Sequence, residues 1–177
     1  MFNRRKYTDS EMNEIIKSVV ILIDSQEKVN DHITTYYDKH KVKYKTLSLL
    51  CGDYSVMLPQ NVELGILNDM YFYNDIILER KNSLEEISGC FTQTRNRFNN
   101  EFSTSYANRK YLLIENATYE DLVSGNYNTE YNKKSFLASL HSFNIKYDLQ
   151  LMFLKDKNYS PIYILGVMQY YIRYLLK

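Results

Sequence analysis

Apolar residues gather along this chain in short, uninterrupted runs that polar stretches separate. The run at residues 19–23, VVILI, is apolar and largely β-branched, which is typical of a strand buried on both faces of a sheet. Comparable runs predict further strands at residues 44–50, 54–58, 71–81, 111–115 and 149–154. The pattern therefore predicts a central sheet that is covered on both sides.

Helices are predicted between these strands by apolar periodicity and capping residues. After Ser83, apolar positions recur every three or four residues, which predicts one helix with a single apolar stripe. That stripe consists of Leu84, Ile87, Phe91, Thr94 and Phe98. Further helices are expected at residues 7–17, 29–41, 134–147 and 160–176, whereas 59–68 and 117–132 have the composition of loops. This order of elements predicts the α/β class, with helices around a central mixed sheet.

Length and composition favour a single domain over residues 1–177, with residues 1–6 frayed. The formal net charge is only +1, so a nucleic-acid partner has to be argued from local patches. Cys51 and Cys90 stand in no metal-binding spacing, and we expect both to be reduced thiols. No apolar stretch suits a membrane span or a signal peptide, so we expect a cytoplasmic protein without a membrane partner.

Carboxylates stand at or near the ends of several predicted strands. Asp24 follows the first strand, Asp53 precedes the third, and Glu79 lies close to the end of the fourth. Glu27 and Glu85 follow in the next segments of chain. Functional sites of open α/β sheets assemble at strand ends, and Mg²⁺ prefers a few carboxylates together with waters and phosphate oxygens. The pattern therefore favours a divalent-metal site.

Glu79, Arg80 and Lys81 occupy successive positions of one predicted strand. Neighbouring strand residues point to opposite faces, so Glu79 and Lys81 share one face and Arg80 points to the other. A metal on these carboxylates can acidify a bound water, while the Lys81 ammonium orients that water or neutralises a charged transition state. Simpler alternatives exist for each residue alone. A salt bridge explains Glu79 and Lys81, a turn explains Asp24, and a capping box explains Glu86.

Four segments taken together resemble the ERCC4-type nuclease domain, the XPF-like branch of the restriction-endonuclease-like superfamily. They are IDSQE (23–27), GDY (52–54), ERKNSLEE (79–86) and YLLIE (111–115). The family pattern is Gly-Asp, then Glu-Arg-Lys followed after three residues by Asp, with Asp-x-Arg-Glu at the end of an earlier strand. The resemblance covers nearly the whole chain. The chain is similar to the compact, single-domain forms of the family in bacteriophages and mobile elements of low-GC Gram-positive bacteria. Gln26 stands where the family usually carries Arg, and Glu85 stands where it carries Asp.

The resemblance implies a restriction-endonuclease-like fold and Mg²⁺- or Mn²⁺-dependent hydrolysis of phosphodiester bonds in DNA. It implies that Asp53, Glu79 and Lys81 are catalytic, and that Asp24 joins Asp53 and Glu79 as a metal ligand. Supporting roles fall to Glu27, Arg80 and Glu85. The family analogy favours branched DNA, such as replication or recombination intermediates, in the cytoplasm of a bacterial host. The alternatives are a non-catalytic DNA-binding scaffold, a nuclease that degrades any DNA, and a purely structural phage protein.

Two local basic patches are candidates for DNA contact. KHKVKYK, residues 39–45, carries four lysines, among them Lys41 and Lys43, and two aromatic residues. Arg95 and Arg97 follow the ERK segment, where the family also carries an arginine. A solvated surface explains both patches equally well. The three histidines, His32, His40 and His141, are interpreted as unpaired structural or surface residues.

The last predicted helix, 160–176, is apolar on more than one side. Its apolar positions are Ile162, Leu165, Met168, Tyr171, Ile172 and Leu175. It either wedges into the core or forms the seam of a homodimer, which the family habit favours.

Overall fold

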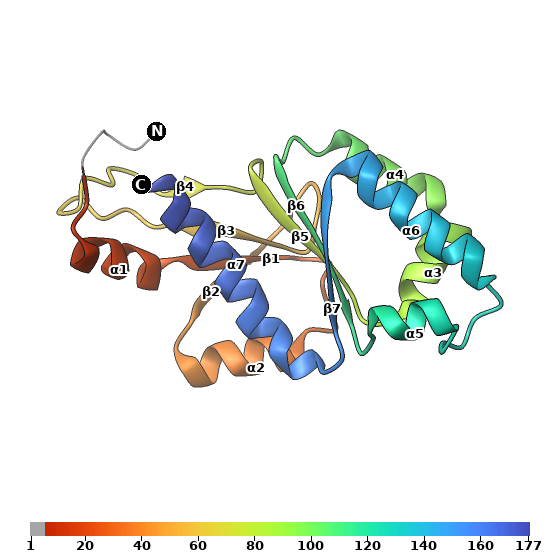
Figure 1. Cartoon of the computed structure of the whole chain (residues 1–177). Coiled ribbons are helices and arrows are strands. Elements are labelled where there is room, and N and C mark those ends of the chain that lie inside the picture. The colour runs from red at the N-terminus through yellow and green to blue at the C-terminus, as the bar shows by residue number, and fades with distance from the viewer. Residues whose placement is uncertain (1–5) are drawn as a thin grey trace.

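The computed structural model describes residues 6–177, and the prediction of a frayed segment at 1–6 lies almost entirely outside that range. A mixed sheet of seven strands forms the centre of the molecule (Figure 1). The strands are β1 (Val20–Asp24), β2 (Lys43–Leu47), β3 (Tyr54–Leu58), β4 (Met70–Tyr71), β5 (Ile76–Lys81), β6 (Arg109–Glu115) and β7 (Leu149–Leu154). The predicted α/β class with a central mixed sheet is confirmed.

The strand order is β2-β1-β3-β5-β6-β7, and β4 pairs with β3 beside this path. β3 is antiparallel to its neighbours β1, β4 and β5, whereas β1–β2, β5–β6 and β6–β7 are parallel pairs. The C-terminal ends of β1 and β5 therefore lie next to the start of β3, at one end of these strands. This end of the strands carries the candidate site.

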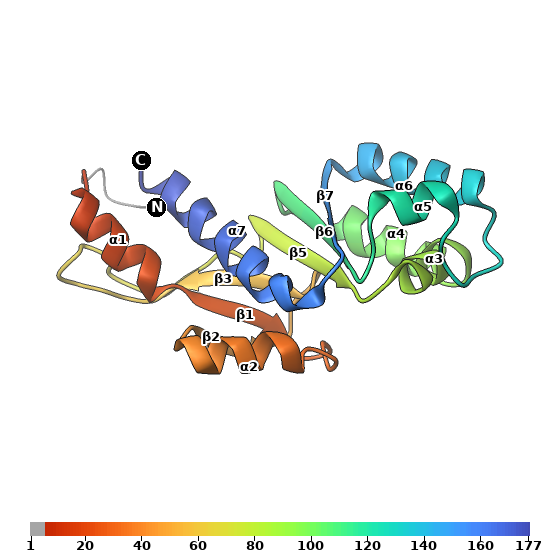
Figure 2. The ribbon, with the colours of Figure 1, turned by 60° about the horizontal axis from the view of Figure 1, so that its bottom comes forward.

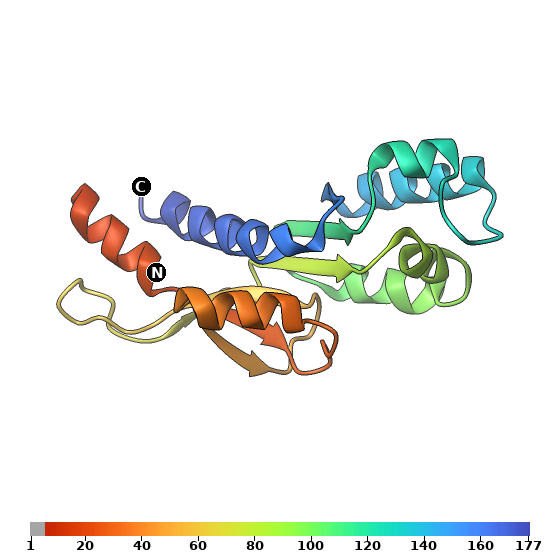
Figure 3. The same cartoon turned by 90° about the horizontal axis from the view of Figure 1, so that it is seen from below.

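Seven α-helices and a short 3-10 helix lie around the described part of the sheet. They are α1 (Asp9–Ser18), α2 (Asp31–His40), α3 (Leu84–Thr92), α4 (Arg95–Thr104), α5 (Tyr119–Ser124), α6 (Lys133–Tyr147), η1 (Lys157–Tyr159) and α7 (Ser160–Leu175). Figure 2 shows α3 to α6 grouped together, apart from α1, α2 and α7. The same group of helices is separate in the view from below, where α7 runs beside α2 (Figure 3).

Two apolar cores match these two groups of helices. Leu113 of β6 packs in the core with residues of α1, α2 and α7, whereas its neighbours Leu112 and Ile114 pack in the core with residues of α3 to α6. This alternation is the consequence of strand geometry, in which successive side chains leave opposite faces. One end of α7 is fastened to α2, because the Tyr37 hydroxyl donates to the Pro161 carbonyl oxygen at 3.2 Å. Among the described residues, no helix has the length and apolarity needed to cross a membrane.

Two predicted elements differ from the structure because local turns interrupt them. The strand predicted at 71–81 is two strands, since a turn in which the Asp75 N–H donates to the Phe72 carbonyl separates β4 from β5. The helix predicted after Ser83 is also two helices. The N–H groups of Gln93 and Thr94 both donate to the Gly89 carbonyl, which ends α3, and Thr94 is exposed rather than part of the apolar stripe.

The segment predicted as a loop at 117–132 contains a helix, α5. Thr118 and Asp121 form a capping box at its start, in which each side chain accepts from the other residue's backbone N–H. Gly125 ends the helix with φ 83°, a left-handed conformation that glycine adopts without steric cost. The prediction was wrong here because the polar composition concealed a short helix defined by its caps.

Candidate active site

The Gly-Asp pair places Asp53 between two strands. Gly52 has φ +75°, and a Cβ atom at this position would lie 2.9 Å from the Cβ of Ile77, so only glycine lets the loop approach β5 this closely. The Asp53 N–H then donates to the Leu78 carbonyl of β5 at 2.9 Å. On the other side, the Asp24 N–H donates to the Asp53 carbonyl at 2.8 Å. The backbone of Asp53 is therefore fixed where β1, β3 and β5 meet.

The end of β5 brings the predicted carboxylate and ammonium together. Glu79 and Lys81 share one face of the strand, and the Lys81 Nζ lies 2.6 Å from Oε1 of Glu79. Oδ2 of Asp53 accepts a hydrogen bond of 2.7 Å from the Arg80 backbone N–H between them. Asp53, Glu79 and Lys81 thus meet in one place, as the alternation along the strand predicts.

Burial shapes the ionisation of this cluster. Desolvation raises the pKa of Asp53 well above its ordinary value, and the negative charge of Glu79 adds to the shift while Lys81 opposes it. Desolvation also raises the pKa of Glu79, again with Lys81 in opposition. For Lys81, burial lowers the pKa, but the charges of Glu79 and Asp53 outweigh burial and raise it overall. The buried Glu79 carboxylate and the partly buried Asp53 carboxylate therefore share one ammonium group, which leaves a deficit of positive charge.

The cluster opens into a polar cleft of about 290 Å³. Its lining includes the predicted residues Asp24, Glu27, Asp53, Glu79, Arg80, Lys81 and Arg97. It also includes Gln26, Glu86, Cys90, Thr94, Phe98 and Glu101, which come largely from α3, α4 and the turn between them. Glu86 and Glu101 carry charge into the cleft, and the sequence analysis assigned neither of them to the site.

Asp24 and Glu27 line the cleft, but both carboxylates already have partners. Oδ1 of Asp24 accepts from the Leu49 N–H at 2.9 Å, and Oδ2 accepts from the Gln26 N–H at 3.3 Å. These contacts are those of a turn residue, the simpler alternative considered for Asp24. Oε1 of Glu27 forms an ion pair of 2.5 Å with the Arg80 guanidinium.

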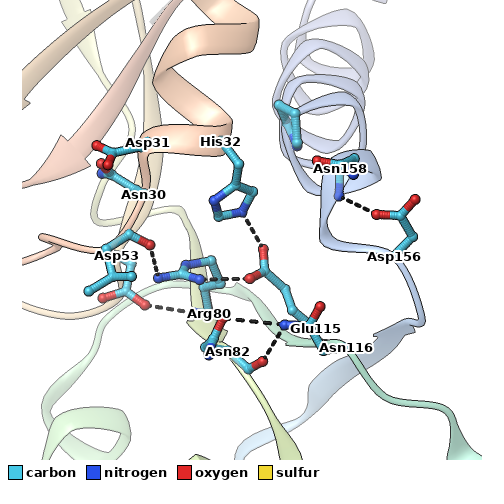
Figure 4. A network of polar contacts seen from close by, with 12 residues as sticks. Asn30, Asp31, His32, Asp53, Arg80, Asn82, Glu115, Asn116, Asp156 and Asn158 are labelled. Carbon is cyan, nitrogen blue, oxygen red and sulfur yellow. Dashed lines mark hydrogen bonds and ion pairs between the residues drawn. The ribbon is translucent and has the colours of Figure 1, made fainter.

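Arg80 points to the other face of the sheet, as predicted, and is the centre of a buried network (Figure 4). Its guanidinium donates to Glu27, to the Val29 carbonyl at 2.9 Å and to Oε2 of Glu115 at 2.7 Å. Oε1 of Glu115 lies 2.9 Å from Nε2 of His32. Glu115 is the last residue of the YLLIE segment, and no role was predicted for it from the sequence.

The three histidines take the structural or surface positions expected of them, but none of them is unpaired. His32 contacts Glu115, and Nε2 of His141 lies 3.1 Å from the Tyr119 hydroxyl. His40 stacks on the Tyr36 ring. Each partner is brought to its histidine by the fold or by helical spacing, which the isolated histidines in the sequence did not reveal.

The structure does not bring Glu85 to the cleft. Its Oε1 accepts from the Asn128 N–H at 2.8 Å, and it lines a neighbouring hollow that shares Glu86, Cys90 and Thr94 with the cleft. Glu86 faces the cleft instead, with Oε1 3.7 Å from the Lys81 Nζ and Oε2 accepting from the Asn82 N–H at 2.8 Å. Half of the predicted capping box forms, since the Glu86 N–H donates to Ser83 Oγ at 3.3 Å, but the Glu86 carboxylate accepts from the Asn82 N–H instead of the Ser83 N–H.

The four basic residues considered for DNA contact lie in two places. Arg97 lines the cleft, and Arg95 lines a shallow hollow beside it on the turn between α3 and α4. Lys41 ends α2 with φ 56°, and Lys43 begins β2. The β1–β2 register pairs Lys43 with Val20, whereas Asp24 at the cleft pairs with Leu47. The two lysines therefore lie toward the opposite end of β1 from the carboxylates.

A divalent cation would find two suitable carboxylates in the cleft, those of Asp53 and Glu79. Within residues 6–177, no three His, Cys, Asp or Glu side chains are grouped so that they could hold a metal ion. Mg²⁺ is usually held by one or two carboxylates, with waters and substrate phosphate oxygens completing its shell. Asp53 and Glu79 meet that description, since both are desolvated and share a single ammonium partner. The residues present fit a two-carboxylate site, and the Asp24 carboxylate lines the same cleft.

The chain is similar to one known domain family in sequence and to solved structures in fold. The ERCC4 domain model matches residues 23–165. Two similar solved structures are XPF from Aeropyrum pernix, with a TM-score of 0.59 and 14% identity, and XPF from Aeropyrum pernix in complex with DNA, with a TM-score of 0.62 and 15% identity. They cover 86% and 87% of this chain, which in turn spans only 61% and 65% of theirs. At these identities the likeness is one of fold.

No curated protein sequence matches the chain. The match to the family model nevertheless includes every element that builds the cleft, from the end of β1 to the start of α7. The chain belongs to the ERCC4 domain family.

Proposed function

We propose that this protein is a divalent-metal-dependent endonuclease that hydrolyses phosphodiester bonds in DNA, with branched DNA as its substrate class. The observation that carries the proposal is the meeting of Asp53, Glu79 and Lys81 in one polar cleft. Membership of the ERCC4 family and a fold shared with an XPF solved in complex with DNA support it. A scaffold without catalysis has no need of two neighbouring carboxylates that lack sufficient positive charge.

Asp53 and Glu79 are the residues that would hold Mg²⁺ or Mn²⁺. When bound there, the cation supplies an acidified water and stabilises the charge that develops on the phosphate. The Gly52 turn and the Arg80 N–H keep Asp53 at the end of β5, beside Glu79.

Lys81 acts as a hydrogen-bond donor rather than as a base. Its ammonium is 2.6 Å from Glu79, and the charges of Glu79 and Asp53 raise its pKa, so it keeps its proton at neutral pH. A fixed ammonium at the edge of the cleft can donate to a phosphate oxygen on which negative charge accumulates. Glu86 helps to hold this ammonium, since its Oε1 lies 3.7 Å away on the cleft side.

The arginines of the α3–α4 turn are the nearest candidates for contacts with DNA phosphates. Arg97 lines the cleft and Arg95 the adjoining hollow, so both can reach phosphates next to the scissile one. Lys43 pairs with Val20, which lies four residues, or about 13 Å, before Asp24 along β1. Lys41 and Lys43 can therefore contact only a duplex that continues along the sheet from the cleft. The net charge of +1 gives little general attraction for duplex DNA, which favours recognition of shape.

We also propose that the protein forms a homodimer through the outer side of α7. Ile164, Met168 and Ile172 are buried in the core, so the helix is wedged there. Its outer side exposes Tyr170 and Tyr174, which border a hollow of about 690 Å³. Sedimentation analysis of the purified chain tests whether a second copy covers this side.

A cleavage assay on matched DNAs tests the proposal. Linear duplex, single strand, flap, fork and four-way junction are incubated with Mg²⁺, Mn²⁺ or EDTA, beside Lys81→Ala. We expect metal-dependent cutting of the branched DNAs that the variant loses. Equal cutting of every DNA would refute the branched substrate and retain the nuclease. Binding of junctions without any cutting would refute the enzyme in favour of a scaffold.

A further inference from the structure

Glu115 is a fully buried carboxylate that the proposed mechanism does not use. Its exposed fraction is 0%, and it ends β6 on the face of the sheet opposite to Glu79 and Lys81. A carboxylate in such a place requires partners, and each of its oxygens has one. Oε2 accepts from the Arg80 guanidinium at 2.7 Å, and Oε1 lies 2.9 Å from Nε2 of His32 (Figure 4).

Arg80 joins this network to the catalytic residues through its own backbone. Its side chain is 4% exposed and fastened to Glu115, to Glu27 and to the Val29 carbonyl. Its backbone N–H donates to Oδ2 of Asp53. One residue therefore fixes the catalytic carboxylate through its main chain and is itself fixed through its side chain.

The pairing of the strands shows why this matters for Asp53. The β3–β5 ladder has a single residue pair, Tyr54 with Leu78, so β3 does not hold the end of β5 beyond that point. On this side, the Asp53 carboxylate takes the place of a ladder partner for the Arg80 N–H. On the other side β5 is paired with β6 up to Lys81 and Ile114, directly before Glu115. The position of Arg80 relative to β6 thus determines where the Asp53 carboxylate is held.

We propose that Glu115, supported by His32, is a positioning residue that clamps Arg80 and thereby holds the Asp53 carboxylate in place for the divalent cation. The clamp unites four elements: the loop after β1 through Glu27, the start of α2 through His32, β5 through Arg80 and β6 through Glu115. Glu115 and His32 do not line the cleft, whereas Arg80 and Glu27 also border it. The role of Asp53 in binding the cation rests on the proposed nuclease function, whereas the holding of Asp53 by Arg80 and Glu115 does not.

The first test measures hydrogen exchange of the Arg80 amide by NMR in the metal-free protein. Glu115→Gln keeps an acceptor for Arg80 but removes the charge, and Glu115→Ala removes both. Ile172→Val is the matched control, because it trims a fully buried side chain near the far end of α7. Rates are compared with that of the Leu113 amide, which lies deeper in β6. We expect the Arg80 amide to exchange about 10-fold faster in Glu115→Ala, less so in Glu115→Gln, and unchanged in the control.

The second test measures Mn²⁺ affinity by calorimetry and cleavage kinetics on the same variants. Loss of residues that orient metal ligands commonly weakens metal affinity by about 10- to 100-fold, and we expect this range for Glu115→Ala. The kcat should fall while DNA affinity measured in EDTA stays unchanged. An unaltered Arg80 amide in Glu115→Ala would overturn the clamp. A faster amide with wild-type Mn²⁺ affinity would overturn its role in positioning. If the wild-type protein neither binds Mn²⁺ nor cuts DNA, the nuclease proposal fails, and the amide exchange still decides whether Glu115 holds Asp53.

Discussion

The ammonium nitrogen of Lys81 lies 2.6 Å from Oε1 of Glu79, two residues earlier on the same strand. This contact is the most direct consequence of strand alternation in the site, and it leaves Asp53 as a second, partly buried carboxylate without an ammonium of its own. We expect Lys81→Met, which keeps the length of the stem and removes the charge, to lower kcat by about 10²- to 10³-fold. Single-turnover cleavage with saturating Mg²⁺ measures the loss. Lys81→Arg is the control that keeps the charge, and wild-type cleavage by Lys81→Met would contradict the assignment.

Asp53→Asn should abolish metal-dependent cleavage while the protein remains folded. The amide oxygen can still accept the Arg80 N–H, so the local backbone is retained, but a metal-binding carboxylate is lost. Removing a negative charge from the cleft should also leave DNA binding equal or tighter. Cleavage, thermal unfolding and fluorescence anisotropy with a labelled fork measure the three properties. A parallel loss of stability and activity would show that Asp53 is structural.

The raised pKa of Asp53 predicts how metal-free stability depends on pH. Because the folded-state pKa lies above the unfolded value of about 3.9, the folded protein binds more protons in the interval between the two, and stability falls as pH rises through it. Asp53→Asn lacks this group. The melting temperature of the variant relative to wild type should therefore increase from pH 4 toward neutral pH, and Mg²⁺ should reverse the difference. A difference that is independent of pH would contradict the shift.

Glu85 and Glu86 form a matched pair for mutation. Glu85 bonds the Asn128 N–H in a neighbouring hollow, whereas Glu86 lies 3.7 Å from the Lys81 ammonium in the cleft. We expect Glu85→Gln to leave kcat within about twofold of wild type and Glu86→Gln to lower it several-fold, because only the second removes a partner of Lys81. Parallel cleavage assays decide between them. The reverse order of effects would mean that Glu85 moves into the cleft when DNA binds.

Arg97→Ala should weaken DNA binding without changing the chemical step. Removing one phosphate contact should reduce the slope of log affinity against log salt by about one unit. Lys43→Ala is the comparison, since Lys43 lies toward the far end of β1 from the cleft and should matter only for long duplexes. Anisotropy titrations over a range of salt, with short and long forks, separate the two. Identical slopes for wild type and Arg97→Ala would remove Arg97 from the interface.

Strand interiors and the alternation of Glu79, Arg80 and Lys81 could be predicted because each depends on neighbouring residues alone. A continuous apolar run has few alternatives to a buried strand, and a period of two then places every side chain on a face. The break between α3 and α4 and the short helix α5 could not be predicted from apolar periodicity, because turns and caps of a few polar residues decide them. The choice between Glu85 and Glu86 depends on how α3 is rotated against the cleft.

The sequence by itself determined most strands, most helices and the proposed site residues Asp53, Glu79 and Lys81, since strand geometry places Glu79 and Lys81 on one face and Gly52 marks the close approach of Asp53. Only the tertiary structure decided what surrounds them. Arg80 meets Glu115 across 35 residues of chain and Glu27 across 53, and His32 meets Glu115 across 83. Contacts at such separations depend on strand order and helix packing. No local preference encodes these contacts, so the network that holds Asp53 is visible only in the folded chain.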